Sequence, residues 1–155
     1  MGVKDVMVKE VITVEPATKI RDAVELMNKN EIGCLVVTRK GKPVGIMTER
    51  DVLKKIVCQC KNPEQTRVSE IMSEPLVVGK VDMDLQEAAR LMLRRNIKKL
   101  PIVDGEKLVG LITLTDIALT SWCPHRFGYL ASRPKNDSIP EECLICPKIV
   151  NCMRG

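Results

Sequence analysis

The segment Gly45–Asp51, with the sequence GIMTERD, recurs 65 positions later as Gly110–Asp116, with the sequence GLITLTD. The same shift aligns the flanking residues without a gap, and a constant offset over about 50 residues indicates a duplicated supersecondary unit. Identical pairs under this shift include Val3 and Val68, Met7 and Met72, Ala23 and Ala88, Met27 and Met92, Gly45 and Gly110, Thr48 and Thr113, and Asp51 and Asp116. The repeat therefore decides the fold.

Each copy predicts the order strand, helix, strand, strand, helix. The first strands are short apolar runs at residues 11–14 and 76–78. Both first helices carry apolar residues at i, i+3, i+4 and i+7, the spacing of one helical face: Ile20, Ala23, Val24 and Met27, and then Leu85, Ala88, Ala89 and Met92. A hairpin follows in each copy, with strands at 35–38 and 44–47 and at 101–103 and 108–112. The second helices begin near Glu49 and Leu114. The predicted fold class is α+β, built from a duplicated β-α-β-β-α unit with a small metal-binding tail.

The domain organisation follows from the repeat. We expect a first repeat at residues 1–60, a second at 61–120 and a cysteine-rich tail at 121–155, with residues 59–67 as the linker between the repeats. A single copy of about 50 residues would bury little apolar surface alone, so two copies are expected to share a core. The aromatic residues all fall in the tail, at Trp122, Phe127 and Tyr129, which marks it as a separate unit.

Composition sets the broad class of the protein. Of 155 residues, 45% are hydrophobic and 29% are charged, which is ordinary for a globular protein. The longest apolar runs are too short to span a bilayer, and the first residues lack the apolar stretch of a signal peptide. We therefore expect a cytoplasmic protein that does not enter the membrane. The net charge of +5 is compatible with a solvated surface or with attraction of nucleotide phosphates.

The two repeated corners, Gly45–Asp51 and Gly110–Asp116, have two interpretations. Thr followed three residues later by Asp forms a capping box, in which the threonine caps the helix and the acid complements the helix dipole. The functional interpretation adds a ligand, because a helix N-terminus and a hydroxyl attract phosphate and a carboxylate can accept from both hydroxyls of a ribose. A hydroxyl, a carboxylate and an apolar slot are the three parts that a nucleotide needs.

This pattern resembles a tandem pair of cystathionine-β-synthase (CBS) domains, over roughly residues 3–120. The resemblance implies a pseudo-twofold module with two clefts between its repeats. It also implies that the clefts bind AMP, ADP, ATP or S-adenosylmethionine, and that two modules pair into a homodimer.

The resemblance implies four sets of ligand-binding residues: ribose acids, phosphate-facing threonines, apolar base slots and basic residues near the phosphates. Carried over by position, these are Asp51 and Asp116; Thr48 and Thr113; Ile46, Met47, Leu111 and Ile112, with the backbone of Thr13, Val14, Val77 and Val78; and Lys98 and Lys99, ahead of Pro101. A solvated helix end is the alternative for the two lysines.

The two copies are not equivalent. The first has Arg50 inside its motif where the second has Thr115. The segment 33–34 is Gly-Cys in the first copy, and the matching pair 98–99 is Lys-Lys in the second. We therefore expect unequal affinities in the two clefts, and we expect Arg50 and the lysines to serve one ligand together.

The cysteines of the tail predict a metal site. Four thiolates, or three and a histidine, can hold zinc, which would fold a tail too short to have a core of its own. The candidate ligands are Cys123, Cys143, Cys146 and Cys152, with His125 as an alternative. An iron–sulfur cluster, free thiols and disulfides remain as alternatives. In placement the tail is similar to the small zinc-ribbon-like domain that some archaeal CBS-pair proteins carry. Cys34 is predicted to be a buried small hydrophobe.

We expect a binding module and not an enzyme. There is one histidine, and the sequence has no nucleophile elbow, no Walker A motif and no dinucleotide glycine fingerprint. The leading hypothesis is a regulatory module that senses an adenine nucleotide or S-adenosylmethionine and acts on an unidentified protein partner. The alternative is a nucleic-acid-binding or transcription-associated protein that uses the basic surface and the metal tail. A thiol redox protein is a third hypothesis, which the lack of a thioredoxin-like context around Cys143 and Cys146 disfavours.

Overall fold

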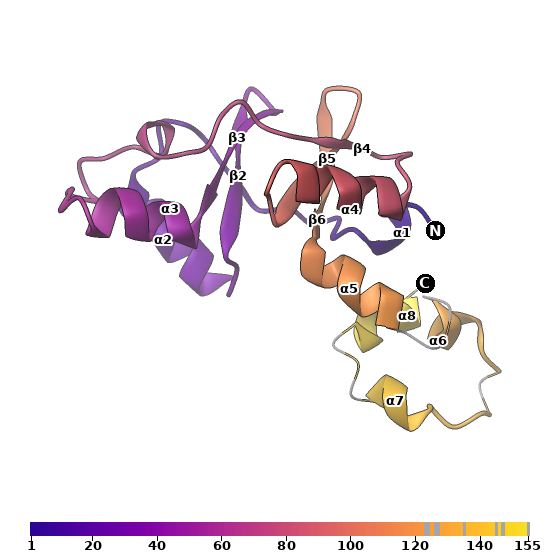
Figure 1. Cartoon of the computed structure of the whole chain (residues 1–155). Coiled ribbons are helices and arrows are strands. Elements are labelled where there is room, and N and C mark those ends of the chain that lie inside the picture. Colours follow the sequence, from indigo (N-terminus) through magenta and orange to yellow (C-terminus); the bar gives the residue numbers. More distant parts are fainter. Residues whose placement is uncertain (123–124, 126–127, 135, 145, 147, 155) are drawn as a thin grey trace.

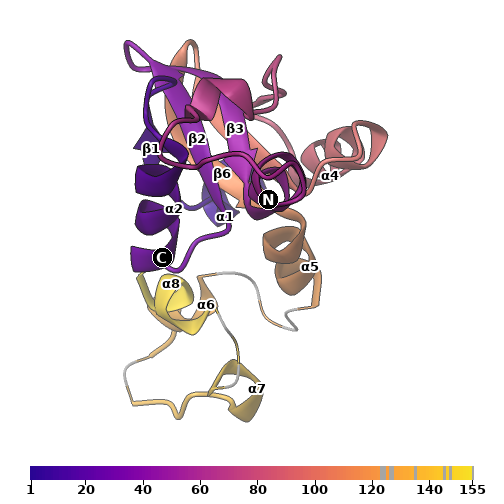
Figure 2. The same cartoon turned by 90° about the vertical axis from the view of Figure 1, so that its left-hand side faces the viewer.

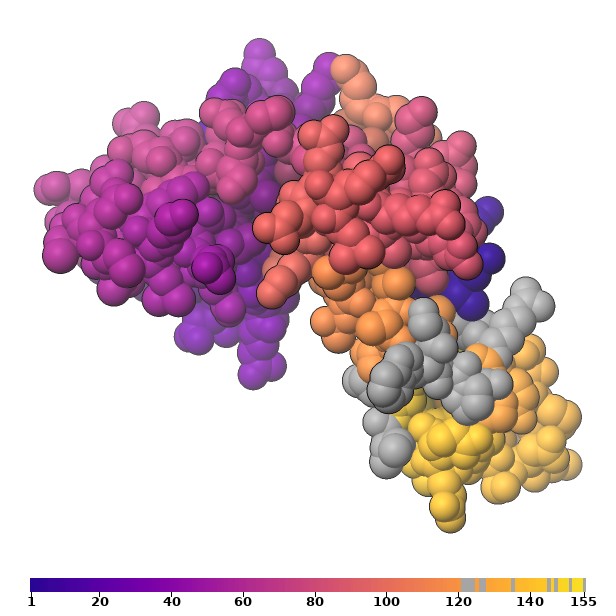
Figure 3. All heavy atoms as spheres, viewed as in Figure 1, coloured from indigo at the N-terminus to yellow at the C-terminus, as the bar shows by residue number. Residues whose placement is uncertain are grey.

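The protein consists of two similar α+β halves and a helical tail, as the computed structural model shows (Figure 1). The structure describes residues 1–122, 125, 128–134, 136–144, 146 and 148–154. In both cartoons the tail lies at the end of the molecule opposite the hairpin tips (Figures 1 and 2). The space-filling view shows the tail as a separate mass below the second half, and the outline of the molecule is indented between the two halves (Figure 3).

The elements of the two halves follow one another in the same order. In chain order, the first repeat has α1 (Val3–Val6), β1 (Thr13–Val14), α2 (Ile20–Lys29), β2 (Cys34–Arg39), β3 (Lys42–Thr48) and α3 (Glu49–Val52), which continues as the π-helix η1 (Leu53–Val57). The second repeat has the 3-10 helix η2 (Val68–Glu70), β4 (Gly79–Lys80), α4 (Leu85–Arg94), β5 (Lys99–Asp104), β6 (Lys107–Thr113) and α5 (Leu114–Trp122). The tail has α6 (Tyr129–Ser132), α7 (Glu141–Leu144) and α8 (Ile149–Arg154).

Each half contains one three-stranded sheet with the same topology. The first strand pairs parallel with the second, which pairs antiparallel with the third, in the orders β1-β2-β3 and β4-β5-β6. The antiparallel register shifts between Val37 and Thr38 in one sheet and between Ile102 and Val103 in the other, which are equivalent positions. The duplicated sequence thus reproduces its pairing down to one local irregularity.

Helices α2 and α4 each bury one apolar face against their own sheet. Ile20, Ala23 and Met27 are the buried residues of α2. In α4, Asp84 caps the N-terminus by accepting a hydrogen bond of 2.8 Å from the backbone N–H of Gln86. The predicted amphipathic helices are therefore present, with Val24 as the exception on the predicted face, since it is 36% exposed.

Each repeat begins with a leading segment that packs into the core of the other half of the molecule. The first core contains Val68, Ile71 and Met72, which begin the second repeat in the sequence. The second core contains Val3 and Val6, from the very start of the chain. Figure 1 accordingly shows α1 beside α4 and β6 in the second half of the molecule. Neither core is complete without residues from the other repeat.

A pair of backbone hydrogen bonds holds each exchanged segment in place. Val8 and Leu111 exchange both backbone hydrogen bonds at 2.9 Å, and the equivalent pair, Ser73 and Ile46, does the same at 2.8 and 3.3 Å. These bonds attach each leading segment to the third strand of the other half as an isolated antiparallel bridge. The repeat in the sequence does not predict this exchange, because the offset of 65 relates equivalent residues and does not say in which half they pack.

The predicted strand order is confirmed, and one predicted strand lies elsewhere. The parallel strand of the second sheet is at Gly79–Lys80, after the predicted residues 76–78. In the first sheet Thr13 pairs with Val36, but the residue equivalent to Val36 is Pro101. A proline has no N–H to donate to a ladder, so the pairing in the second sheet begins one position later.

Gly45 and Gly110 allow the exchanged segments to cross the third strands closely. A Cβ on Gly110 would lie 2.4 Å from the Sδ and 2.8 Å from the Cγ of Met7, and a Cβ on Gly45 would lie 2.8 Å from the Sδ of Met72. The first residue of the repeated motif is thus glycine because of packing between the halves.

We predict that Gly110→Ala lowers the free energy of unfolding by about 1–3 kcal/mol, the typical cost of overpacking. Urea denaturation measures it. Combining Gly110→Ala with Met7→Ala should cost less than the sum of the two single changes, because the truncated Met7 leaves room for the new methyl group. Gly2→Ala is the matched control, since its Cβ would meet no atom closer than 3.6 Å. Additive costs in the double variant would contradict this explanation.

Candidate functional site

Both repeated corners form a capping box, as the sequence predicted. At the first corner the backbone N–H of Thr48 donates to Oδ2 of Asp51 at 2.9 Å, and the Asp51 N–H donates to the Thr48 hydroxyl at 3.3 Å. At the second corner the matching distances between Thr113 and Asp116 are 2.9 and 3.1 Å. Each threonine hydroxyl also donates to the same Oδ2. The capping interpretation is therefore realised at both corners, and it uses one carboxylate oxygen of each acid.

The second carboxylate oxygen of each acid contacts a lysine. Oδ1 of Asp51 lies 3.1 Å from Nζ of Lys55, one turn further along the same helical segment. Oδ1 of Asp116 forms an ion pair with Nζ of Lys148 in the tail. Asp116 is 7% exposed, so its charge is largely removed from water. Capping thus leaves one oxygen of each acid for another donor, and at both corners that donor is a lysine.

A cleft between the halves gathers predicted site residues from both repeats. It has a volume of about 380 Å³, within the range of roughly 300–1,000 Å³ that small-molecule sites occupy. The residues that line it are Gly33, Ile46, Thr48, Glu49, Arg50, Ile97, Lys98 and Lys99. The structure thus brings Arg50 of the first repeat next to the lysine pair of the second; that these residues serve one ligand stays a prediction.

Three cations, Arg50, Lys98 and Lys99, give this cleft a positive charge, and Glu49 opposes it. Arg50 and Lys98 are exposed and Lys99 is half-buried. A Cβ on Gly33 would lie 3.1 Å from Nζ of Lys99 and 3.4 Å from the carboxyl carbon of Glu49, so these two charges flank the same glycine. The excess of positive over negative groups suits an anionic ligand such as a phosphate.

The predicted base-slot residues lie on opposite faces of the third strands, β3 and β6. Met47 and Ile112 are fully buried in the two cores, whereas Ile46 and Leu111 are half-buried. Successive residues of a strand face opposite sides, so the members of each pair cannot share a surface. Of the four predicted base-slot residues, this leaves Ile46 and Leu111 with accessible side chains.

The predicted backbone contacts with the base also differ between the copies. Thr13 and Val14 form β1 and pair with β2, and Val14 is buried. Val77 and Val78 precede β4 and are half-buried, and Pro101 is buried in β5. Thr115 is exposed on α5. The two corners therefore share their capping geometry and differ in the groups around it.

Cys34 is buried beside the cleft, as predicted. Burial raises the pKa of its thiol, and Glu49 adds to this, while the nearby Lys99 ammonium lowers it in part. The net direction is upward, so the thiol stays protonated and unreactive to a higher pH than an exposed cysteine.

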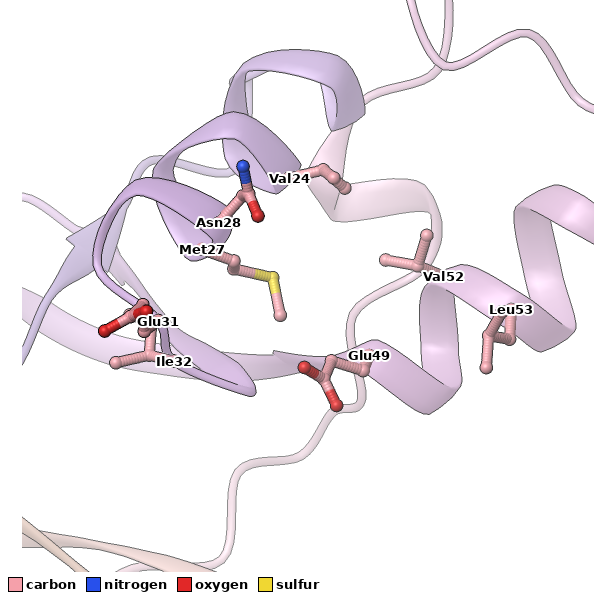
Figure 4. A pocket seen from close by; sticks show the side chains of 8 residues that line it. All are labelled: Val24, Met27, Asn28, Glu31, Ile32, Glu49, Val52 and Leu53. Atoms are coloured by element: carbon pink, nitrogen blue, oxygen red, sulfur yellow. The ribbon is translucent and has the colours of Figure 1, made fainter.

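A groove between α2 and the segment formed by α3 and η1 was not predicted as a site. It has a volume of about 610 Å³, and Val24 and Met27 of α2 face Val52 of α3 across it (Figure 4). Leu53 also lines the groove and is 59% exposed. The sequence carried a signal here, because Val24 continues the apolar face of α2 beyond what the sheet covers.

In the tail, two of the described cysteines lie in a small apolar cluster, and a third, Cys146, is half-buried outside it. Cys143 and Cys152 are buried together with Leu130. His125 stacks on Tyr129 with ring centroids 4.4 Å apart, and its Nε2 lies 2.8 Å from Oε1 of Glu142.

The predicted zinc site gains no support from this arrangement. Among the described residues no group of three or more His, Cys, Asp or Glu could hold a metal ion. Cys123, one of the predicted ligands, lies outside the described residues. The proposed ligands Cys143, Cys146, Cys152 and His125 therefore stay a prediction. No helix in the described part of the chain is long and apolar enough to cross a membrane.

Comparison with known proteins agrees with this architecture. A family model, the CBS domain, matches residues 3–58 and 68–121. A CBS domain-containing protein of Bacillus subtilis, YhcV, is 40% identical over 118 residues, which cover 76% of this chain and 84% of that protein.

Two solved structures are also similar. One is a CBS domain pair in complex with 5′-methylthioadenosine and S-adenosyl-L-methionine, with 31% identity, a TM-score of 0.70, and coverage of 76% of this chain and 93% of that one. The other is a hexameric CBS-CP12 protein from bloom-forming cyanobacteria, with 30% identity, a TM-score of 0.72, and coverage of 81% and 77%.

We predict that Cys34 reacts much more slowly with iodoacetamide at pH 8 than Cys58 and Cys60, which are exposed. The raised pKa keeps the Cys34 thiol neutral below that pKa, and thiolate accumulates only as the pH rises through it. Lys99→Met should move the reaction of Cys34 to still higher pH, because the ammonium that lowers the thiol pKa is gone. Mass spectrometry of labelled peptides resolves each cysteine. Equal labelling of Cys34 and Cys58 in the folded protein would contradict the prediction.

Proposed function

Because this chain belongs to the CBS domain family, we propose that it is a regulatory module that binds an adenosine derivative in the cleft between its repeats. CBS domains generally act as ligand-sensing modules for such compounds, and the related pair described above binds 5′-methylthioadenosine and S-adenosyl-L-methionine. The observation that carries the proposal for this chain is the meeting of Thr48 and Arg50 of one repeat with Lys98 and Lys99 of the other in one cleft.

The groups around the cleft fit the parts of a nucleotide. The cations Arg50, Lys98 and Lys99 would bind the phosphates, and charge-assisted hydrogen bonds of this kind are stronger than neutral ones. The apolar side chain of Ile46 would contact the base. Asp51 and Asp116 do not line this cleft; at the two corners, each would accept from ribose hydroxyls with the carboxylate oxygen that capping does not use. Three cations favour a phosphorylated ligand over S-adenosylmethionine, whose sulfonium is itself positive.

We propose a binding role without catalysis. The charged groups that line the cleft, Glu49, Arg50, Lys98 and Lys99, form no pair of a nucleophile and a base. A ligand that spans both repeats would instead act on the angle between the halves, and it would bias a partner protein through its differential affinity for two conformations.

We predict that Asp51→Asn and Asp116→Asn each weaken binding at one corner about tenfold or more, the cost of losing a hydrogen bond to a charged group. Asparagine keeps an oxygen to cap the helix but replaces the second carboxylate oxygen by an amide group. Isothermal titration with AMP, ADP, ATP and S-adenosylmethionine measures the affinity of each variant. Asp104→Asn, at an exposed hairpin turn, is the control. Undiminished affinity in the double variant would refute the ribose assignment.

We further propose that two copies of this chain pair through the groove between α2 and α3. Val24 and Leu53, which line this groove, are 36% and 59% exposed. Val57 of η1 and Leu93 of α4 are further exposed apolar residues, at 61% and 70%. A second copy offers a matching apolar surface. The related cyanobacterial CBS-CP12 protein is hexameric.

We predict that Leu53→Glu turns a dimer of this 17.3 kDa chain into a monomer, since a charge in a buried apolar interface stays unpaired. Analytical ultracentrifugation gives the mass. Gln65→Glu adds the same charge at an exposed site in the linker and should leave the dimer intact. A Leu53→Glu variant that sediments as the wild type would exclude this groove as the dimer interface.

A further inference from the structure

The ion pair between Asp116 and Lys148 connects the second corner to the tail. The Lys148 and Asp116 side chains keep 15% and 10% of their exposure, so the pair is largely shielded from water. Among the ion pairs between described residues, it is the one that joins the tail to a repeat. The proposed ribose acid of the second corner is thus in contact with a part of the chain that lies outside the repeats.

The first corner shows what Lys148 replaces. There, Asp51 pairs with Lys55 of its own helical segment, and Lys55 also donates to the backbone carbonyl of Ile71 at 2.6 Å. The residue equivalent to Lys55 in the second repeat is Thr120, whose hydroxyl donates to the backbone carbonyl of Asp116 at 2.7 Å and not to its carboxylate. The second repeat therefore supplies no lysine at this position, and the tail supplies one.

The capping box and Lys148 together engage both carboxylate oxygens of Asp116. Oδ2 already accepts from both the N–H and the hydroxyl of Thr113, at 2.9 and 2.8 Å. Oδ1 contacts Lys148, and the residue is 7% exposed. A ribose diol would approach the same Oδ1.

We propose that Lys148 and the ribose of a bound nucleotide compete for Oδ1 of Asp116, so that ligand binding at the second corner releases the tail. The inference rests on the proposed function, because it takes an adenosine derivative as the competitor. The consequence is an asymmetric sensor: at the first corner a ligand displaces a lysine of the same helical segment, and at the second it displaces the tail.

The release would involve the tail as a folded unit. The backbone carbonyl of Lys148 accepts from the N–H of Cys152 at 2.9 Å, which ties it to α8. Cys152 in turn packs against Leu130 and Cys143. A change at the Lys148 ammonium therefore reaches α6, α7 and α8 through contacts already present, and the tail can report ligand binding to a partner.

Such a coupling is reciprocal. If the docked tail weakens nucleotide binding by some factor, bound nucleotide weakens tail docking by the same factor. Removing the ammonium should therefore do two things: loosen the tail without ligand, and strengthen ligand binding at the second corner. A lysine that only neutralises Asp116 would have the first effect without the second.

The test compares Lys148→Met, which keeps the length of the side chain without its charge, with Lys148→Arg, which keeps the charge. Hydrogen exchange of the α8 amides is measured without ligand and with saturating AMP, ATP or S-adenosylmethionine. Exchange of the α4 amides serves as an internal reference for global stability. Isothermal titration with the same compounds gives the affinities of each variant.

We expect Lys148→Met to speed α8 exchange about tenfold without ligand and to tighten binding at least fivefold, the low end of typical coupling. Lys148→Arg should behave as the wild type, in which ligand should speed α8 exchange. Unchanged α8 exchange in ligand-free Lys148→Met would overturn the proposal. The proposal would also be overturned if a ligand binds the wild type without altering α8 exchange and binds Lys148→Met no more tightly. In that case the proposed function would still stand. If titration finds no ligand for either protein, the proposed function fails, and the competition fails with it.

Discussion

The reciprocal exchange of leading segments holds the two halves of the molecule together. Val3 and Val6 complete the second core, and Val68 and Ile71 complete the first. Because each half needs residues from the other to exclude water from its core, the two repeats form one cooperative unit and cannot be separated without exposing apolar surface. The exchange also fixes how the third strands β3 and β6 face each other. The cleft between the halves therefore has a defined shape before any ligand is present.

Each strand-to-helix corner combines a structural and a proposed functional role in one carboxylate. Oδ2 of Asp51 or Asp116 closes a capping box, which orients the side chain and holds it in place. Oδ1 then points to a cation, and in the proposed function it would point to a sugar. A carboxylate held by its cap loses little conformational freedom when a ligand arrives, which favours binding.

A symmetric backbone here carries asymmetric charges. The two sheets have the same register, including the same irregularity. At equivalent positions of the two repeats, however, Arg50 corresponds to Thr115, Gly33 to Lys98, and Lys55 to Thr120. The positive groups of the cleft consequently come from both repeats, and the second acid is neutralised by the tail. Duplication thus supplied the scaffold, and substitutions at a few surface positions made the two corners different.

The repeat, the order of strands and helices, the capping boxes at Thr48 and Thr113, and the burial of Cys34 could all be predicted from the amino-acid sequence, because they depend on local periodicity and on spacings of a few residues. The resemblance to CBS pairs also led to the expectation that Arg50 and the lysine pair serve one ligand, and the structure brings these residues together in one cleft. Three features became visible only in the folded chain: the exchange of the leading segments, the later start of the parallel strand at Pro101, and the contact of Lys148 with Asp116. Each of these is a contact between residues far apart in the chain, and hydrophobic pattern and local propensity specify which face of an element is buried but not which distant partner covers it.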